Sequence, residues 1–177
     1  MKKTIINISL VLIAYFLYFL QSNFFSWFTI AGVMPNLFVI LVLFIGLFHG
    51  RTAGIIYGLA IGMILDLVLG KQIGVNMIGL GIIGFLAALF DKNFSKDSRA
   101  TIMFMVLGAT IIFEVMVYVA NGILYASNME LFNFVKILAV EVIYNLILTI
   151  IIYPLIQKFG YYIENEYKGN KILTRYF

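Results

Sequence analysis

Residues 54–66 read GIIYGLAIGMILD, an apolar stretch in which Gly54, Gly58, Gly62 and Asp66 recur every four residues. On a helix with 3.6 residues per turn, this spacing keeps the four positions on one slowly turning face. Glycines at this spacing allow the backbone of a second helix to approach closely. A carboxyl group within hydrocarbon is costly, so such an acid is usually paired or functional. We therefore expect one helix to carry both a packing surface and a buried acid.

The composition of the 177-residue chain is that of an integral membrane protein. Hydrophobic residues make up 63% and charged residues only 11% of the chain, whereas a soluble domain has roughly a quarter charged residues. The absence of cysteine and the single histidine exclude disulfides and the common metal clusters, so we expect no metal and no cofactor. The net charge of +4 favours anionic lipid over nucleic acid as a partner, because the basic residues lie in loops and at the chain ends.

Apolar runs predict an all-α integral membrane protein, a bundle of six transmembrane helices in one domain of residues 1–158. The first run lacks a small-residue cleavage site, so we interpret it as a retained span and not as a signal peptide. The second and third runs are short, but merging them would bury Arg51 in mid-membrane. Residues 159–177 predict a cytoplasmic tail, either a short interfacial helix or a frayed end. The predicted spans are 5–26, 34–48, 53–70, 73–90, 100–125 and 133–158.

The basic residues predict that both the N-terminus and the C-terminus are cytoplasmic. With the N-terminus inside, ten of the twelve lysines and arginines fall on the cytoplasmic side, and only Lys71 and Lys136 fall outside. Pro35 suits the first turn of the second helix, and Pro154 is expected to kink or end the sixth helix. Arg51 is expected to anchor the inner interface beside lipid phosphate.

Three acids lie well within the predicted spans, namely Asp66, Glu114 and Glu141. A desolvated acid pairs with a cation or keeps its proton, and Lys71 and Lys136 are the cations expected on the same side. The acids either form a polar cavity for a ligand or a proton, or make hydrogen bonds between helices and contacts to a partner helix. The other expected members of this intramembrane polar core are Asn76, Asn121, Asn145 and Lys136.

No pattern typical of an enzyme is present in the sequence. It has no phosphate-binding loop, no nucleophile elbow and no metal-ligand spacing. The predicted cytoplasmic loops are too short for a catalytic domain. We therefore expect no catalytic residues and no enzymatic activity.

The order of motifs over residues 34–90 adds a family resemblance. A proline opens the second helix, Gly50-Arg51 precedes the third, spaced glycines lead to Asp66, and a glycine-rich fourth helix follows. This arrangement resembles the bacterial rod shape-determining protein MreD. The positions that follow the family pattern are Pro35, Arg51, Gly54, Gly58, Gly62, Asp66 and Gly74.

The resemblance implies a non-catalytic scaffold subunit of the cell-elongation (rod) complex, located in the bacterial plasma membrane as a multi-pass protein. Its implied partners are an MreC-like single-span protein, the MreB filament, the glycosyltransferase RodA and a class B penicillin-binding protein. The implied role is support of cell-shape control and of lateral peptidoglycan synthesis.

Two alternatives to the scaffold function stay open at this point. The MreD fold is thought to be similar to that of the substrate-binding S components of energy-coupling-factor vitamin transporters. The first helix has bulky residues apart from Ala14, which counts against such a component because its docking face should carry small residues. A proton-coupled transporter that uses the three acids as a relay ranks last, because the sequence lacks inverted repeats and broken helices.

Overall fold

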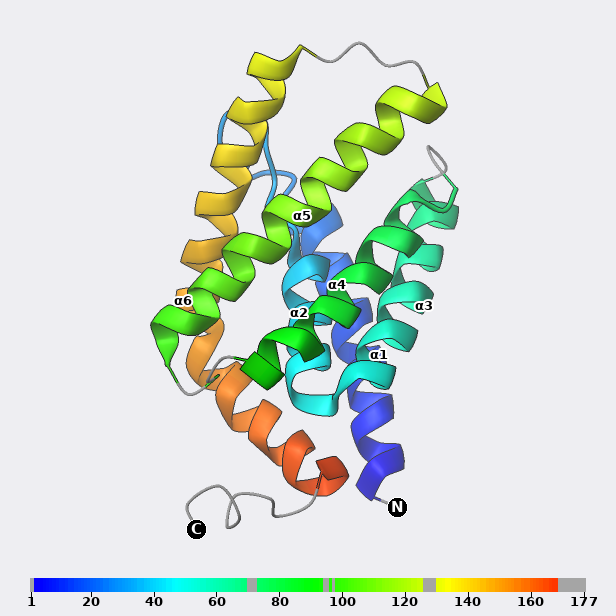
Figure 1. Cartoon of the computed structure of the whole chain (residues 1–177), viewed down its shortest axis with the longest axis vertical. Helices are drawn as coiled ribbons and strands as arrows, with labels where there is room; N and C mark the ends of the chain where they lie inside the picture. The colour runs from blue at the N-terminus through cyan, green and yellow to red at the C-terminus, as the bar shows by residue number, and fades with distance from the viewer. Residues whose placement is uncertain (1, 70–72, 94–95, 97, 126–129, 169–177) are drawn as a thin grey trace.

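The computed structural model describes residues 2–69, 73–93, 96, 98–125 and 130–168. Nearly all of these residues lie in six α-helices, and the first continues directly into a short π-helix. The prediction of an all-helical fold is confirmed, and the six helices fit the six predicted spans (Figure 1). The elements are α1 (Lys2–Phe19), η1 (Leu20–Phe24), α2 (Leu37–His49), α3 (Arg51–Leu69), α4 (Val75–Asn93), α5 (Arg99–Tyr125) and α6 (Leu131–Lys168).

The helix α2 lies inside the bundle and contacts each of the other five α-helices. Its side chains are apolar on all sides and almost all buried, as expected for a helix enclosed by protein. Its 13 residues extend about 20 Å, less than the roughly 30 Å of bilayer hydrocarbon. Asn36 caps α2, since its side chain accepts a hydrogen bond from the Val39 backbone N–H at 3.2 Å. Pro35 therefore lies before the helix, and the prediction that it lies in the first turn is wrong.

The helices α3 and α4 pack antiparallel and share the most extensive contact between any two described helices. The three spaced glycines of α3 face the backbone of α4. A Cβ atom at Gly54 would lie 2.7 Å from the carbonyl oxygen of Gly84, and one at Gly58 would overlap the carbonyl group of Leu80. Gly62 meets the first turn of α4 in the same way. The glycine face is therefore occupied by a helix of the same chain.

The helix α6 is longer than the predicted sixth span, because it continues through Pro154 to Lys168. A proline lacks the N–H group for the helical hydrogen bond and crowds the preceding turn, and the orange part of α6 changes direction in Figure 1. Gly160 brings this part close to α2, where a Cβ atom would meet the ring of Phe48. Residues 159–168 thus continue α6 and pack on the bundle, whereas residues 169–177 lie outside the described residues.

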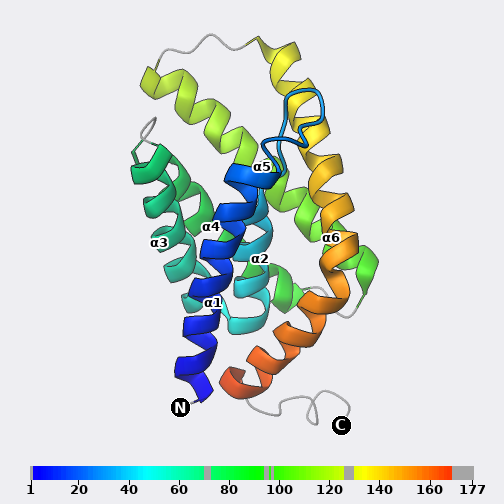
Figure 2. The same cartoon turned by 180° about the vertical axis from the view of Figure 1, so that it is seen from behind.

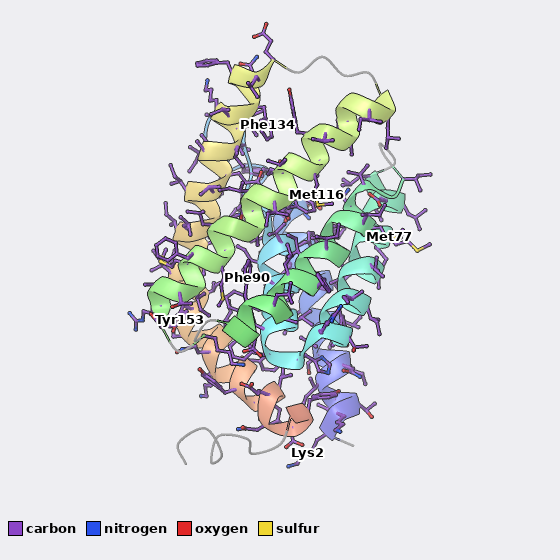
Figure 3. All side chains as sticks on the ribbon, in the orientation of Figure 1. Lys2, Met77, Phe90, Met116, Phe134 and Tyr153 are labelled. Atoms are coloured by element: carbon purple, nitrogen blue, oxygen red, sulfur yellow. The ribbon has the colours of Figure 1, made fainter. Side chains whose placement is uncertain are left out.

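The start of α1 and the end of α6 meet at one end of the molecule, which we call the terminal end (Figure 2). The Lys2 ammonium donates a hydrogen bond to Glu166 at 3.1 Å. The Tyr167 hydroxyl donates to the Lys3 carbonyl oxygen at 3.0 Å. In Figure 3, Lys2 marks this end and Phe134 of α6 lies toward the other. The start of α1 and the end of α6 therefore lie on the same side of the bundle.

A buried lysine strengthens the terminal end. Lys96, between α4 and α5, is 8% exposed and forms ion pairs with Asp91 at 2.7 Å and Glu164 at 2.6 Å. Its ammonium group also lies 5.1 Å from the centre of the Phe48 ring. These contacts tie α4 and α2 to the part of α6 that follows Pro154.

The outer surface of the bundle is strongly apolar. Within the described residues, four helical segments are long and apolar enough to cross a membrane, and α2 and α4 are shorter apolar helices. Large exposed side chains cover α1 and α3, for example Tyr15, Ile64 and Leu67. Such a surface suits lipid or a partner helix and is unlike that of a soluble protein.

Candidate functional site

The carboxylate of Asp66 closes the turn between α3 and α4. The residue is only 2% exposed. Its Oδ2 atom accepts hydrogen bonds from the backbone N–H groups of Gly74 at 2.8 Å and Met77 at 3.0 Å. Its Oδ1 atom accepts from the backbone and side-chain N–H groups of Asn76 at 3.1 Å and 2.8 Å. The positive φ of Gly74, +97°, suits a residue without a Cβ atom.

These donors explain how a buried acid is tolerated here. The first N–H groups of any helix lack partners within the helix and form the positive end of its dipole. Asp66 supplies acceptors for the start of α4, so the negative charge and the free N–H groups offset each other. The sequence predicts a cation or a retained proton at Asp66, and the structure shows four N–H donors around its carboxylate. Of the two candidate cations, Lys71 lies outside the described residues.

A second buried polar group, which we call the glutamate cluster, joins the start of α2 to α5 and α6. It consists of Asn36, Thr110, Glu114, Glu141 and Asn145. The Asn145 side chain accepts from the Asn36 backbone N–H at 2.8 Å and donates to the Thr110 hydroxyl at 3.0 Å. The side chains of Glu114 and Glu141 form hydrogen bonds with each other and with Asn36. Since carboxylates only accept, the bond between the two glutamates requires a proton on one of them.

A pocket of about 360 Å³ opens beside the glutamate cluster. Glu141 is 6% exposed, and its Oε1 atom is buried without a hydrogen-bond partner. Gln21 lines the pocket and accepts a hydrogen bond from the Leu37 backbone N–H at 3.1 Å. The remaining lining residues are Ala31, Gly32, Val33, Met34, Pro35, Asn36 and Ile137.

The loop of the pocket has an uncommon backbone conformation. Ala31 has φ +52° and Gly32 has φ +79°. A positive φ is easy for glycine and strained for alanine. This loop precedes the Asn36 cap, so the same chain reversal shapes the pocket and starts α2.

The other predicted site residues lie apart from these two groups. Lys136 is exposed in the first turns of α6, and it does not face Glu141 because positions five apart on a helix differ by about 140°. Asn121 lies further along α5 and is partly buried. Arg51 begins α3 at the terminal end, where its guanidinium group lies 4.4 Å from the centre of the Phe85 ring. Lys71 lies outside the described residues.

Gln21 and Thr110 are not among the site residues predicted from the sequence. Thr110 lies four residues before Glu114, so the spacing of polar residues along α5 could have predicted it. Gln21 is a single polar residue near the end of an apolar run, and nothing in its spacing points to α2. Its role depends on a contact between segments 16 residues apart.

Long apolar helices with polar groups buried between them define this chain as a membrane protein. The sequence model of one family, described as rod shape-determining protein MreD, matches residues 2–163. The chain belongs to the MreD family, as the motifs of residues 34–90 predicted, and membership assigns it to rod shape determination and to the cell-shape complex at the membrane. Searches of curated proteins and of solved structures give no match.

Proposed function

We propose that this protein is a non-catalytic scaffold subunit of the cell-elongation complex in the bacterial plasma membrane, where it binds an MreC-like single-span protein. The observation that carries the proposal is the family match, which runs from the start of α1 into α6 beyond Pro154. Through this partner the protein supports the work of MreB, RodA and a class B penicillin-binding protein in lateral peptidoglycan synthesis.

We further propose that the chain crosses the membrane six times with both termini in the cytoplasm. Lys2 and Glu166 lie at the same end of the bundle, which supports an even number of membrane crossings. Arg51 and Arg99 begin helices at the same end of the bundle, and Lys136 lies near the other end. Positive charge concentrates on cytoplasmic sides, so the terminal end is the cytoplasmic end in this proposal.

The packing of the bundle narrows the surface available to a partner helix. The glycine face of α3 is covered by α4, so a partner has to use an outward face. The helix α1 buries only Ile6 and Leu10 within the chain and exposes most of its other large side chains. The outward faces of α1 and α3 are therefore the surfaces to test.

The experiment is purification of the tagged protein from its own membranes, followed by mass spectrometry of the proteins that accompany it. Photo-crosslinking residues locate the contact. They are introduced at three exposed positions, Tyr15 in α1, Ile64 in α3 and Phe104 in α5. We expect recovery of an MreC-like protein and cross-links from one of these faces. Recovery of an ATPase pair with a membrane coupling subunit would instead establish a substrate-capture subunit and contradict the proposal.

A further inference from the structure

The helices α1, α2 and α6 form an apolar groove between them. Its volume is about 100 Å³, and the residues that line it are leucine, isoleucine, phenylalanine and glycine. In Figure 2, the blue α1 and the orange part of α6 lie on either side of α2 and converge at the terminal end. The walls include Leu10, Ile13, Phe44, Leu155, Phe159 and Ile163. The groove therefore offers apolar contacts and no hydrogen-bonding side chain.

The size of the groove favours a hydrocarbon chain as its occupant. Leu155 on one wall is 72% exposed, so the groove opens onto the apolar outer surface of the bundle. An α-helix with its side chains is about 10–12 Å wide and is too wide for a groove of about 100 Å³. A linear hydrocarbon chain is narrow, has no hydrogen-bonding group to satisfy, and gains dispersion contacts along both walls. The acyl chain of a membrane lipid meets these requirements.

Two lysines extend the α1 wall of the groove toward the terminal end. Lys3 lies seven residues before Leu10, and Lys2 lies eleven residues before Ile13. At 3.6 residues per turn, each lysine therefore shares a face of α1 with a residue of the wall. The rise per residue places the lysines about 10–17 Å from these wall residues along the helix axis. Since this distance is about half the thickness of the bilayer hydrocarbon, a lipid with its headgroup at the lysines has its acyl chain at the groove.

The charge at this end of the groove is positive. Lys2 forms an ion pair with Glu166 at 3.1 Å, and an ammonium group has three N–H donors, so Lys2 keeps donors for a further acceptor. Lys3 is exposed, and its ammonium group lies 5.2 Å from the centre of the Tyr167 ring. Among the described residues, no carboxylate forms an ion pair with Lys3. Two cations beside one carboxylate leave an excess positive charge, which complements a lipid phosphate.

We propose that this groove binds one acyl chain of an anionic phospholipid, with the phosphate group beside Lys2 and Lys3. The helix α1 buries only Ile6 and Leu10 within the chain, so a lipid in the groove adds to the few contacts that hold α1 on the bundle. The site does not rest on the scaffold function, and the failure of either proposal leaves the other standing.

The test measures lipid binding to the full chain in detergent by native mass spectrometry. The probes are dioleoyl-phosphatidylglycerol and dioleoyl-phosphatidylcholine, which have the same acyl chains and differ in net charge. We expect the first molecule of phosphatidylglycerol to bind about tenfold or more tightly than phosphatidylcholine, because each basic residue near a membrane surface contributes about fivefold. Equal affinities for the two lipids would overturn the proposal.

Matched variants locate the lipid on the protein. Ile13→Trp fills the groove and should abolish the first binding event, whereas Leu12→Trp, at an exposed position of the same helix, should keep it. Lys2→Gln together with Lys3→Gln should remove the preference for phosphatidylglycerol. Lys158→Gln, at an exposed position of α6 that does not line the groove, should preserve this preference.

Two further outcomes decide against the lipid. If Ile13→Trp does not fold, Leu155→Trp narrows the groove from its exposed wall, and unchanged lipid binding in a folded groove variant refutes the site. A preference for phosphatidylglycerol that survives the loss of both lysines refutes the position of the headgroup. If Ile13→Trp loses the co-purified partner protein while lipid binding is unchanged, the groove belongs to that protein and the proposal is rejected.

Discussion

At the scale of residues, the bundle tolerates its buried acids through hydrogen bonds to individual polar groups. Asp66 lies near the negative end of α3, where an acid is poorly placed, but its carboxylate also lies against the positive end of α4. Because the chain reverses between the two helices, the positive end of α4 lies beside the Asp66 carboxylate and offsets the unfavourable effect of the negative end of α3. The backbone N–H groups at the start of α2 are instead satisfied by amide side chains, namely those of Asn145, Gln21 and Asn36.

We predict that Asp66→Ala lowers the free energy of unfolding by about 2–4 kcal/mol, because it leaves four buried N–H donors without an acceptor. Asp66→Asn should cost less, since the amide oxygen still accepts from one side of the group. Equilibrium unfolding in mild detergent measures both. Glu130→Ala at an exposed position is the control, and equal stability of all variants would show that the N–H groups find other partners.

The sequence identified Asp66, Glu114, Glu141 and Asn145 as buried polar residues because charges and amides stand out in apolar runs. It did not identify their partners. Three of the four donors to Asp66 are backbone N–H groups, which every residue has and no side-chain pattern marks. Gln21 was missed for a related reason, since its partner is the first N–H of α2.

At the scale of helices, the close packing of α3 against α4 depends on glycines, which have no side chain at the contact. We predict that Gly58→Ala destabilises the protein by about 1–3 kcal/mol, because its Cβ atom would overlap the Leu80 carbonyl group. Gly122→Ala on α5 is the matched control, since a Cβ atom there meets nothing within 4 Å. Comparison of their unfolding midpoints tests this, and equal midpoints would mean that the helices separate at little cost.

The part of α6 beyond Pro154 depends on contacts with other elements. We predict that Lys96→Met destabilises the protein by about 2–3 kcal/mol, because it removes the cation between Asp91 and Glu164. Lys158→Met, at an exposed position on the same part of α6, should change stability little. Protease resistance of the C-terminal part of α6 provides the readout. Equal digestion of the two variants would contradict a stabilising role for Lys96.

The helices could be predicted from hydropathy, whereas the ends of α2 and α6 could not. Pro154 predicted a kink or an end, and local chemistry alone does not decide between them. The continuation is stabilised by Phe48 against Gly160 and by Lys96 against Glu164, which are contacts between distant parts of the chain. Likewise, α2 begins after Pro35 and not before it, because Asn36 is the better capping residue.

At the scale of the whole molecule, the proposed orientation has a direct test. The chain has no cysteine, so single cysteines can be introduced without a background of native thiols. We predict that an impermeant maleimide added to intact spheroplasts labels Glu130→Cys but labels Ser98→Cys only after the membrane is permeabilised. Both positions are exposed and lie at opposite ends of the bundle. The reverse labelling pattern would invert the proposed topology.

The enclosed position of α2 also bears on how the protein is made. A ribosome releases α2 before α4, α5 and α6, yet these later helices supply most of its surroundings. A nascent chain that ends after α3 thus holds a short central helix that lacks three of its five helical neighbours, α4, α5 and α6. Completion of the bundle has to wait for the last helix, and a truncated product should be an early target of membrane quality-control proteases.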